Sequence, residues 1–585
     1  MASGASAELD DISCEVAQHR LQMLAEEGGF RASRSAGSPF VMGLGSCASA
    51  IFTREGLIVA QTLGGMMHVS AVREMMQAVL EDFPAETIRQ GDVFLCNDPF
   101  RGGIHPTDLG CFRPIFVGGE LAYFSGMLMI VADMGGVSSG GLPATATEVY
   151  HEGLVLPPVQ IEQQGALCEG VMAVLMANSR VPTQLRTDIQ ALIGATAIVD
   201  QRMREMVERY GKATMDVIVA KLFDHSEAMV RAGLAAIPDG EYRGTYHAQE
   251  DGVGPAKSYE VKVRIAVRGG DCEVDFTGTA RQAPGAINSS YSQSLSFITY
   301  AMRCYLDPEI PMNEGFYRPF RFELPLGTMV NPLSPAAANI RYSTGQAMID
   351  AMHAALRPVF PLWSTAPSSA LVSINAQSAI HASRRWAMLD VVFGPGGARP
   401  GFDANDGTAM PMVGGGGYRQ AAEAYETLFP MRYECIRFAP DTAGPGQWRG
   451  GSGVIADVRL LEDCTLTLRA VDRTQILPEG IAGGGHGRGG GFYLSPDAPE
   501  EKRLPDKSTN HVVAKGALLR LSVAGGGGWG DPMRRNPGAV ADDVRKGVVT
   551  RERALADYGV VLNEDGEPDF AATTEVRRAT VKARA

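Results

Sequence analysis

Several classes of protein are excluded by what this sequence of 585 residues lacks. Lys and Arg number 53 against 66 Asp and Glu, giving a formal charge of −13, and such a chain lacks the basic footprint of nucleic-acid and anionic-membrane binders. The nine cysteines include no C-x-x-C pair, which indicates reduced thiols rather than disulfides or a zinc ribbon. The apolar runs are too short to span a bilayer, and the acidic N-terminus does not resemble a signal peptide. We therefore expect a cytoplasmic protein.

Generic nucleotide and nucleophile motifs are also missing. Gly211-Lys-Ala-Thr214 lacks the upstream glycine of a phosphate loop. Gly136 to Gly140 fits the G-x-S-x-G pattern, but Gly141-Leu-Pro143 follows where that motif needs a helix, so we interpret the segment as a loop. Glycine, in contrast, is abundant at 69 residues, well above the average share of about 7%. Because there is no G-X-Y period, this abundance predicts many turns and close backbone approaches rather than collagen.

The spacing of apolar residues predicts an α+β protein. Helical spacing covers 9–28, 71–83, 181–236 with a break near Gly211, 292–306, 345–357 and two short stretches within 537–558, whereas alternation predicts hairpins at 115–124 and 259–276. We expect a large mixed fold with a helical N-terminal half, antiparallel hairpins and a β-rich, glycine-rich C-terminal region. Three regions are predicted: an N-terminal α/β region at 1–237, a mixed hairpin and helix region at 238–390, and a glycine-rich β region with C-terminal helices at 391–585.

The most informative stretch is GDVFLCNDPFRGGIHPTD, which runs from Gly91 to Asp108. A buried strand leads into the turn Asn97-Asp-Pro99, and His105 and Asp108 follow the glycine pair Gly102-Gly103. Polar side chains on a loop at a strand end are where functional groups usually lie. A His and an Asp three residues apart can face one metal ion or one substrate. The alternative is that His105 only hydrogen-bonds to Asp108, and we favour the functional interpretation.

Other acids and a second histidine are further candidates. His68 precedes the 71–83 helix and is either a functional base or a helix-capping residue. Asp133 ends another predicted strand and is a second candidate carboxylate. Glu148 and Glu152 lie at a predicted helix start, where an acid that only favours the helix dipole is at least as good an interpretation.

The Gly91–Asp108 stretch resembles the signature of the hydantoinase B/oxoprolinase family. The similarity extends over nearly the whole chain, in ATEVYHEGLVLPP at 146–158, DFTGTARQAPGAIN at 275–288, RCYLDPEIPMNEG at 303–315, GPGQWRGGSG at 444–453, AGGGGWGDP at 524–532 and DYGVVL at 557–562. The family includes subunits of ATP-dependent hydantoinases, oxoprolinases and caprolactamase, and of acetone and acetophenone carboxylases.

The resemblance implies a division of labour between subunits. A hydantoinase A-like partner with an actin-like ATPase fold would bind ATP and phosphorylate a small-molecule substrate, and a further small subunit is a second candidate partner. The present chain would then complete the reaction on the activated substrate. In the hydrolases water opens an activated cyclic amide, whereas in the carboxylases an enolate joins CO2.

The chain departs from its relatives where they have, or lie beside, a divalent metal site. Gly43 and Ser46 stand in place of an acidic pair, Ile130 and Val131 in place of paired histidines, and 407–418 in place of a histidine-containing segment. Only His105 and Asp108 clearly remain, with Asp133 in place, and three protein ligands are the usual catalytic minimum. We therefore do not expect a tightly bound divalent metal, and if a residual site exists its ligands would be His105 and Asp108.

Loss of charged ligands would make the site drier, which suits an enolate and CO2 better than hydrolysis. The leading hypothesis is therefore a subunit of an ATP-dependent ketone carboxylase of the acetophenone type. His105 would act as an electrostatic or acid–base group and Asp108 would orient it, with His68 and Asp133 as further candidates. The alternatives are a hydantoinase, oxoprolinase or lactamase subunit that opens a cyclic amide, and a non-catalytic scaffold for the ATPase.

Overall fold

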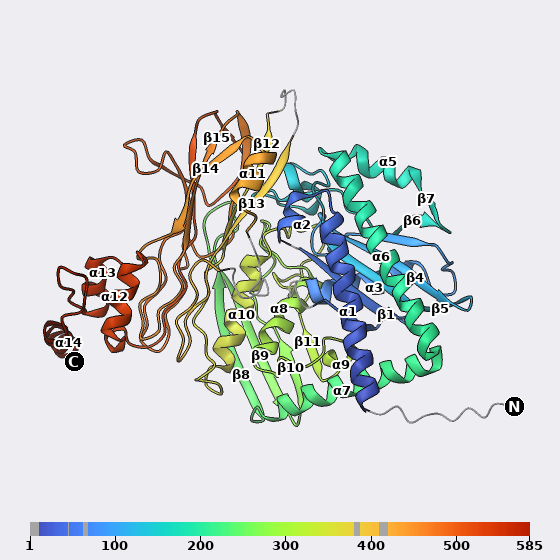
Figure 1. The fold of residues 1–585 in the computed structure, drawn as a ribbon, viewed down its shortest axis with the longest axis horizontal. Coiled ribbons are helices and arrows are strands. Elements are labelled where there is room, and N and C mark those ends of the chain that lie inside the picture. The colour runs from blue at the N-terminus through green and yellow to red at the C-terminus, as the bar shows by residue number, and fades with distance from the viewer. Residues whose placement is uncertain (1–10, 45, 63–67, 380–385, 409–418, 585) are drawn as a thin grey trace.

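The computed structural model describes residues 11–44, 46–62, 68–379, 386–408 and 419–584, and it confirms the α+β class. In Figure 1 the N-terminal sheet and its helices form one side of the molecule, and the last three helices, α12 (Pro537–Arg545), α13 (Arg551–Tyr558) and α14 (Phe570–Arg584), form the opposite side. A second sheet and its helices lie between them. Two further sheets complete the C-terminal part.

The first sheet is antiparallel and has helices on both faces. Its strands follow the order β2-β1-β5-β4-β3-β6-β7. Met127 and Met129 contribute to the core beneath α1 and α6, whereas Phe124 and Leu128 contribute to the core beneath α3, as the two-residue period of a strand requires. The strands are β1 (Cys47–Thr53), β2 (Ile58–Gln61), β3 (Val93–Cys96), β4 (Asp108–Val117), β5 (Glu120–Ile130), β6 (Val159–Gln163) and β7 (Ala166–Leu167). The helices of this part are α1 (Asp11–Ser35), α2 (Pro39–Leu44), α3 (Val69–Asp82), α4 (Val149–Glu152), α5 (Glu169–Ala177), α6 (Pro182–Tyr210) and α7 (Lys212–Ala235).

The middle of the chain forms a four-stranded sheet that α10 covers. The strand order is β11-β10-β9-β8, and only the β10–β11 pair is parallel. The largest hydrophobic core of the molecule lies between this sheet, α8 and α10. The elements are β8 (Gly240–Ala248), β9 (Tyr259–Arg268), β10 (Asp271–Asp275), α8 (Tyr291–Arg303), α9 (Glu314–Tyr317), β11 (Phe320–Glu323) and α10 (Tyr342–Leu356).

Two antiparallel sheets face each other across a third core in the C-terminal part. Their orders are β13-β12-β16-β19 and β14-β15-β20-β17-β18. The elements are β12 (Leu371–Ser378), β13 (Ala387–Phe393), α11 (Ala422–Leu428), β14 (Met431–Phe438), β15 (Val454–Leu460), β16 (Cys464–Ala470), β17 (Gly491–Leu494), β18 (Lys502–Leu504), β19 (Lys507–Val513) and β20 (Leu518–Ser522). Strand β13 crosses residue 390, where the sequence places a region boundary, and the division into three regions stays a prediction.

Glycine makes close backbone packing possible in this C-terminal part. The amide of Gly444 donates to the carbonyl of Gly526 at 2.8 Å, and the amide of Gly528 donates to the carbonyl of Gly485 at 3.0 Å. A Cβ atom at any of these four positions would collide with a neighbouring backbone or proline ring. The abundance of glycine therefore reflects, in this region, segments that hydrogen-bond to one another outside any regular sheet.

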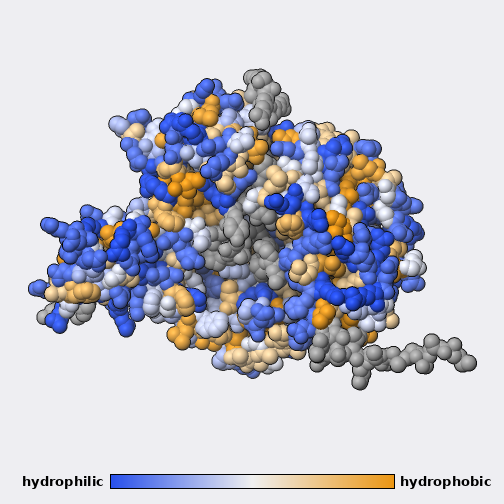
Figure 2. Space-filling view, in the orientation of Figure 1, coloured by the Kyte–Doolittle hydropathy of each residue, from blue (hydrophilic) through white to orange (hydrophobic). Residues whose placement is uncertain are grey.

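Most local expectations from the sequence are confirmed. Gly211, at φ 81°, separates α6 from α7, and Gly269 and Gly270 turn β9 into β10 with positive φ angles. The G-x-S-x-G segment is a loop, because it forms only a single 3-10 turn at Ser139–Gly141 where the motif needs a helix. No described helix is both long and apolar enough to cross a membrane, and the face seen in Figure 2 is largely hydrophilic with hydrophobic residues in small groups.

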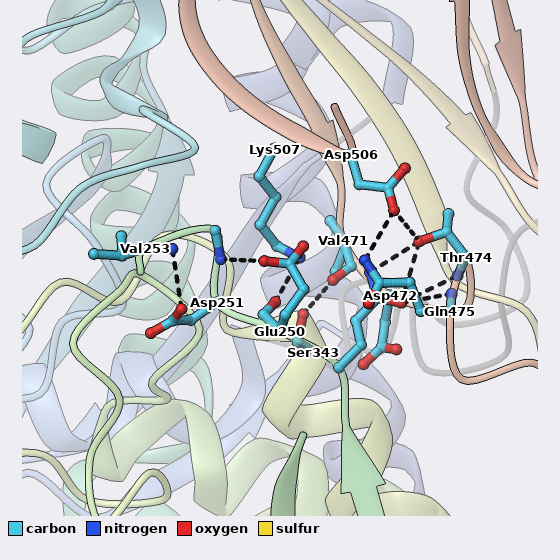
Figure 3. Close-up of polar contacts among 12 residues, drawn as sticks. Glu250, Asp251, Val253, Ser343, Val471, Asp472, Thr474, Gln475, Asp506 and Lys507 are labelled. Carbon is cyan, nitrogen blue, oxygen red and sulfur yellow. Dashed lines mark hydrogen bonds and ion pairs between the residues drawn. The ribbon is translucent and has the colours of Figure 1, made fainter. Parts of the chain in front are cut away.

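Buried polar contacts join the middle and C-terminal parts (Figure 3). The Lys507 ammonium donates to the carbonyl of Glu250 at 2.8 Å and lies 3.3 Å from its carboxylate. The backbone N–H of Thr474 donates to the side-chain oxygen of Gln249 at 3.1 Å, and Ser343 at the start of α10 donates to the carbonyl of Val471. Because these groups are mostly buried, leaving one without its partner would cost about 1–3 kcal/mol. The start of α10 is thereby fixed against the end of β16.

Asp188 of α6 ties the end of β5 to the turn that follows α1. One carboxylate oxygen accepts from the amides of Gly37 and Ser38 at 2.8 and 2.9 Å, and the other accepts from the amide of Ala132 at 3.1 Å. Burial raises the pKa of Asp188 to about 6, although the three amide donors oppose that rise.

The substitution Asp188→Asn should lower the free energy of unfolding by about 1–3 kcal/mol. The side-chain oxygen of Asn can accept from the amides on one side, but its NH2 group would face an N–H donor on the other side. Urea unfolding measures the effect. The control is Asp200→Asn on the same helix. The Asp200 carboxylate pairs with Arg204 one turn away, and its replacement should lower the free energy of unfolding by less than about 1 kcal/mol. Equal losses for the two variants would contradict the interpretation.

Candidate functional site

The loop between β3 and β4 is held in place by Asn97. Its side-chain amide donates to the carbonyls of Pro106 at 2.6 Å and Leu154 at 3.0 Å, and its side-chain oxygen accepts from the amide of Leu156 at 2.6 Å. Asn97 is fully buried, so it uses its donors and acceptor within the protein. The turn-forming sequence after β3 thus places His105 in the interior, whereas an ordinary surface loop would have left it exposed.

The structure brings His105, Asp108 and His68 together. The Nε2 atom of His105 lies 3.2 Å from Oδ2 of Asp108, and Nε2 of His68 lies 4.0 Å from Oδ1. All three side chains are at most 3% exposed. His68 occupies the N-cap position of α3, but its side chain makes no capping hydrogen bond, so the imidazole is not used to cap the helix.

The two imidazoles are neutral. Burial and the charge of Arg341 lower the pKa of His68 to about 3, and burial, Arg341 and Arg469 lower that of His105 well below its ordinary value. The backbone N–H of Thr107 donates to Nδ1 of His105 at 3.3 Å, and the Thr107 hydroxyl lies 2.7 Å from the same atom. Neutral His105 therefore carries its proton on Nε2, the nitrogen that faces Asp108.

Asp108 is a buried carboxyl group whose acceptor capacity is not used. Neither oxygen accepts a hydrogen bond, because the approach of His105 at 3.2 Å lacks hydrogen-bond geometry. The nearest positive charge is the guanidinium of Arg341, 3.6 Å from Oδ2. Burial raises the pKa of Asp108 to about 6, against the opposing effect of Arg341. In the β4–β5 register Asp108 stands directly opposite Ile130, so its immediate cross-strand neighbour is apolar.

Two buried arginines complete the site, and the sequence did not point to either. Arg341 precedes α10, and Arg469 lies in β16. Both guanidiniums donate to the same carbonyl oxygen, that of Asn339, at 3.2 Å and 2.9 Å. Arg341 also donates to Gln293 and to the hydroxyl of Tyr342, over whose ring it stacks at 4.6 Å. The site therefore contains two positive charges that converge on one backbone atom.

Glu152, at the end of the short helix α4, holds the backbone that supports the arginines. One oxygen of its carboxylate accepts from the amides of Ala338 and Asn339 and from the Asn339 side chain, at 2.7–2.9 Å. The other oxygen has no hydrogen-bond partner. Burial raises the pKa of Glu152 to about 7 despite the three N–H donors. Gly136, at φ 76°, allows α4 to approach, since a Cβ there would collide with the carbonyl of His151.

The remaining candidate acids have other partners. Asp133 is fully buried, and its oxygens accept from the amides of Gly140 and Arg180 and from the Arg180 guanidinium, at 2.7–3.0 Å. Its contacts organise the loop after β5, and no contact joins it to His105 or Asp108. Glu148 lies beside His151 at the surface, at 3.4 Å. Of the two helix-start acids, only Glu152 therefore belongs to the site, and it acts by binding a distant segment rather than by favouring its own helix.

The side chains at this site do not fit a divalent cation. Among the residues that the structure describes, no group of three or more His, Cys, Asp or Glu side chains could hold a metal ion. The guanidinium of Arg341, 3.6 Å from Asp108, would oppose a cation at that carboxylate. Ile130 and Val131 offer no ligand, and most of the 407–418 segment lies outside the described residues.

Comparisons with known proteins give the same family over nearly the whole length of the chain. Residues 10–532 match the family model described as hydantoinase B/oxoprolinase. The chain is 29% identical to a protein named as the B-type subunit of a D-/L-hydantoinase from Pseudomonas sp. (strain NS671), over 97% of this chain and 98% of that protein. It is 25% identical to the acetophenone carboxylase delta subunit of Aromatoleum aromaticum, over 99% of this chain and 90% of that subunit. The crystal structure of the ATP-dependent caprolactamase from Pseudomonas jessenii superposes with a TM-score of 0.87 and 25% identity, over 98% of this chain and all of that one.

Replacing Glu152 by Gln should flatten the dependence of stability on pH. The folded pKa of about 7 lies above the ordinary value of 4.5, so the stability linked to the Glu152 proton is complete below pH 4.5 and is lost as pH rises to about 7. Glu152→Gln cannot titrate, and between these pH values its free energy of unfolding should fall by roughly 1–3 kcal/mol less than that of the unmodified protein.

Urea unfolding between pH 5 and pH 8 measures this difference. The control is Glu148→Gln, because the Glu148 side chain is 43% exposed and its replacement should leave the pH dependence unchanged. Parallel curves for Glu152→Gln and the unmodified protein would refute the assignment of a buried, titrating carboxyl group.

Proposed function

Because this chain belongs to the hydantoinase B/oxoprolinase family, we propose that it completes the reaction of an ATP-dependent ketone carboxylase, with an acetophenone-like ketone as substrate. It is a hydantoinase B-type subunit, and its relatives are subunits of multisubunit ATP-dependent enzymes. The observation that supports the proposal is the buried site itself, in which two guanidiniums lie near two neutral imidazoles and one carboxyl group.

Carboxylation needs a dry site. The carbanion of an enolate is quenched by water and by stray protons, and burial strengthens every electrostatic interaction that stabilises it. His68, His105, Asp108, Arg341 and Arg469 are between 1% and 4% exposed. Such burial favours C–C bond formation over attack by bulk water.

The charges of the site suit an enolate and CO2. The nucleophilic carbon of the enolate would attack the carbon of CO2, and the electron pair of one C=O bond would become the negative charge of the new carboxylate. The guanidiniums of Arg341 and Arg469 would stabilise this charge as it develops. His105 would donate its Nε2 proton in a hydrogen bond to the enolate oxygen, and the N–H of Thr107, which binds Nδ1, would hold the ring in place. Asp108 faces the same Nε2 atom without accepting a hydrogen bond from it, so it would act through its charge.

A partner subunit would supply the activated substrate. The chain has no phosphate loop of its own, so the ATP would be bound by a hydantoinase A-like ATPase, with a further small subunit as a second partner. The name of the relative from Aromatoleum aromaticum, a delta subunit, likewise indicates an assembly of several chains.

Opening of a cyclic amide is the second candidate. The identity to the hydantoinase relative, 29%, exceeds that to the acetophenone carboxylase relative, 25%. In that reaction the same arginines would stabilise the oxyanion that forms when water attacks the activated carbonyl. The third candidate, a scaffold without chemistry of its own, differs in making His105 dispensable.

The complex reconstituted with its ATPase partner should fix labelled bicarbonate into acetophenone in the presence of ATP. His105→Ala should lower kcat by about 10²-fold or more, the usual magnitude for a lost acid–base group. The control is His151→Ala, which should keep full activity, because the His151 side chain is 36% exposed and its partners are the neighbouring Thr147 and Glu148.

Each alternative has its own outcome in the same assay. If a hydantoin or lactam is opened and no label is fixed, the carboxylase proposal is wrong and the enzyme is a cyclic amide hydrolase. Unchanged turnover in His105→Ala would exclude a catalytic role for this site and leave the scaffold.

A further inference from the structure

Arg469 stands apart from the other buried arginines. Five described arginines are buried: Arg341, Arg449, Arg469, Arg473 and Arg535. Four of them pair with a carboxylate, namely Arg341 with Asp108, Arg449 with Asp406, Arg473 with Asp350 and Arg535 with Asp403. Arg469 donates only to the carbonyl of Asn339 and to the hydroxyl of Ser373, and its Nε has no partner. A buried charge without a counter-ion is costly.

The surroundings increase that cost. The guanidinium of Arg341 donates to the same Asn339 carbonyl, so two like charges lie close together. Burial and this neighbouring charge lower the pKa of Arg469 to about 9. Glu152 compensates poorly, because burial raises its pKa to about 7 and one of its oxygens is already bound by three N–H donors.

Several acceptors and donors around the arginines are also unused. Nε of Arg469, both oxygens of Asp108 and the side-chain oxygen of Asn339 are buried without a hydrogen-bond partner. Buried polar atoms are nearly always paired in a folded protein, so unpaired atoms gathered at one site indicate the position of a missing ligand. Nε of Arg469 is the one donor among these atoms, and an anionic oxygen is the group to which it would donate, whereas the oxygens of Asp108 and Asn339 need an N–H or O–H donor.

The free donors of Arg469 suit a planar oxyanion. A guanidinium offers five N–H groups in a fixed fork that matches the two oxygens of a carboxylate. Two of these groups are in use, one on each terminal nitrogen, and the single N–H on Nε has no partner. Arg341 has fewer to offer, since it already donates to Gln293, Asn339 and Tyr342. A guanidinium carries one positive charge, which a carboxylate neutralises, whereas a phosphate dianion would leave a negative charge unpaired in this buried site.

We infer that Arg469 is the anchor for a carboxylate group carried by the substrate or product of this site. The inference rests on the proposed function only in using the same site, since both candidate reactions end in a carboxylate. Addition of an enolate to CO2 produces the carboxylate of a β-keto acid. Hydrolysis of a cyclic amide turns its carbonyl group into a carboxylate.

Binding to the full chain without ATP or partner tests this inference. Isothermal titration would compare sodium formate, acetate and bicarbonate with sodium phosphate and chloride at equal ionic strength. We expect the carboxylates and bicarbonate to bind and chloride and phosphate not to. Arg469→Gln should weaken acetate binding by about 10- to 100-fold, the effect of losing one charge-assisted bidentate pair.

A matched control separates a local effect from loss of a buried cation in general. The side chain of Arg113 is 12% exposed and pairs with Glu162 at 3.0 Å, so Arg113→Gln should bind acetate as the unmodified chain does. Arg469→Met removes an unpaired charge, and without ligand its melting temperature should equal or exceed that of the unmodified chain. A lower melting temperature for Arg469→Met would indicate a structural role and overturn the inference.

Larger carboxylates distinguish the two candidate reactions, because each reaction has its own product. Tighter binding of 3-oxo-3-phenylpropanoate than of acetate would support the carboxylate anchor together with the carboxylase. Tighter binding of 6-aminohexanoate would support the anchor but count against the carboxylase. Binding of phosphate alone, no binding of any carboxylate, or equal affinity in Arg469→Gln would each overturn the inference.

Discussion

The site depends on one buried carboxylate, that of Glu152. Its three N–H donors come from Ala338 and Asn339, and the carbonyl of Asn339 in turn accepts from both arginines. A helix of four residues in the N-terminal part thus fixes the segment that leads into α10 in the middle part, and through it a strand of the C-terminal part. Without these hydrogen bonds the Asn339 carbonyl, to which both guanidiniums donate, would not be held in place.

The electrostatics of the site follow from the same arrangement. Two arginines and two acids are all buried, and burial disfavours the charged form of each. The acids yield more readily than the arginines, because a carboxyl group with a pKa near 6 or 7 protonates within the physiological range and a guanidinium does not. The balance is therefore towards positive charge, and a ligand that brings a negative charge restores neutrality.

Local sequence was enough to predict most elements and half of the site. The strand, turn and glycines before His105 are contiguous, so the position of His105 and Asp108 could be inferred from them. Arg469 could not, because it follows Leu466 and Leu468 in an alternating strand and would be expected on the polar face. Its partner Asn339 is 130 residues away, and Glu152 is 187 residues from Asn339. Contacts over such distances are set by packing of whole elements, which periodicity does not report.

Arg341 gives the site a cation of a particular kind. A guanidinium is a diffuse monocation with directed donors, so it can bind an oxyanion but cannot acidify a water molecule as a bound divalent metal does. Across the sheet from Asp108, Ile130 offers only an apolar side chain. Positive charge combined with apolar walls favours a reaction in which an anion is held and water is excluded. That combination, rather than any single residue, is the reason for proposing that an enolate is trapped by CO2 here in preference to hydrolysis.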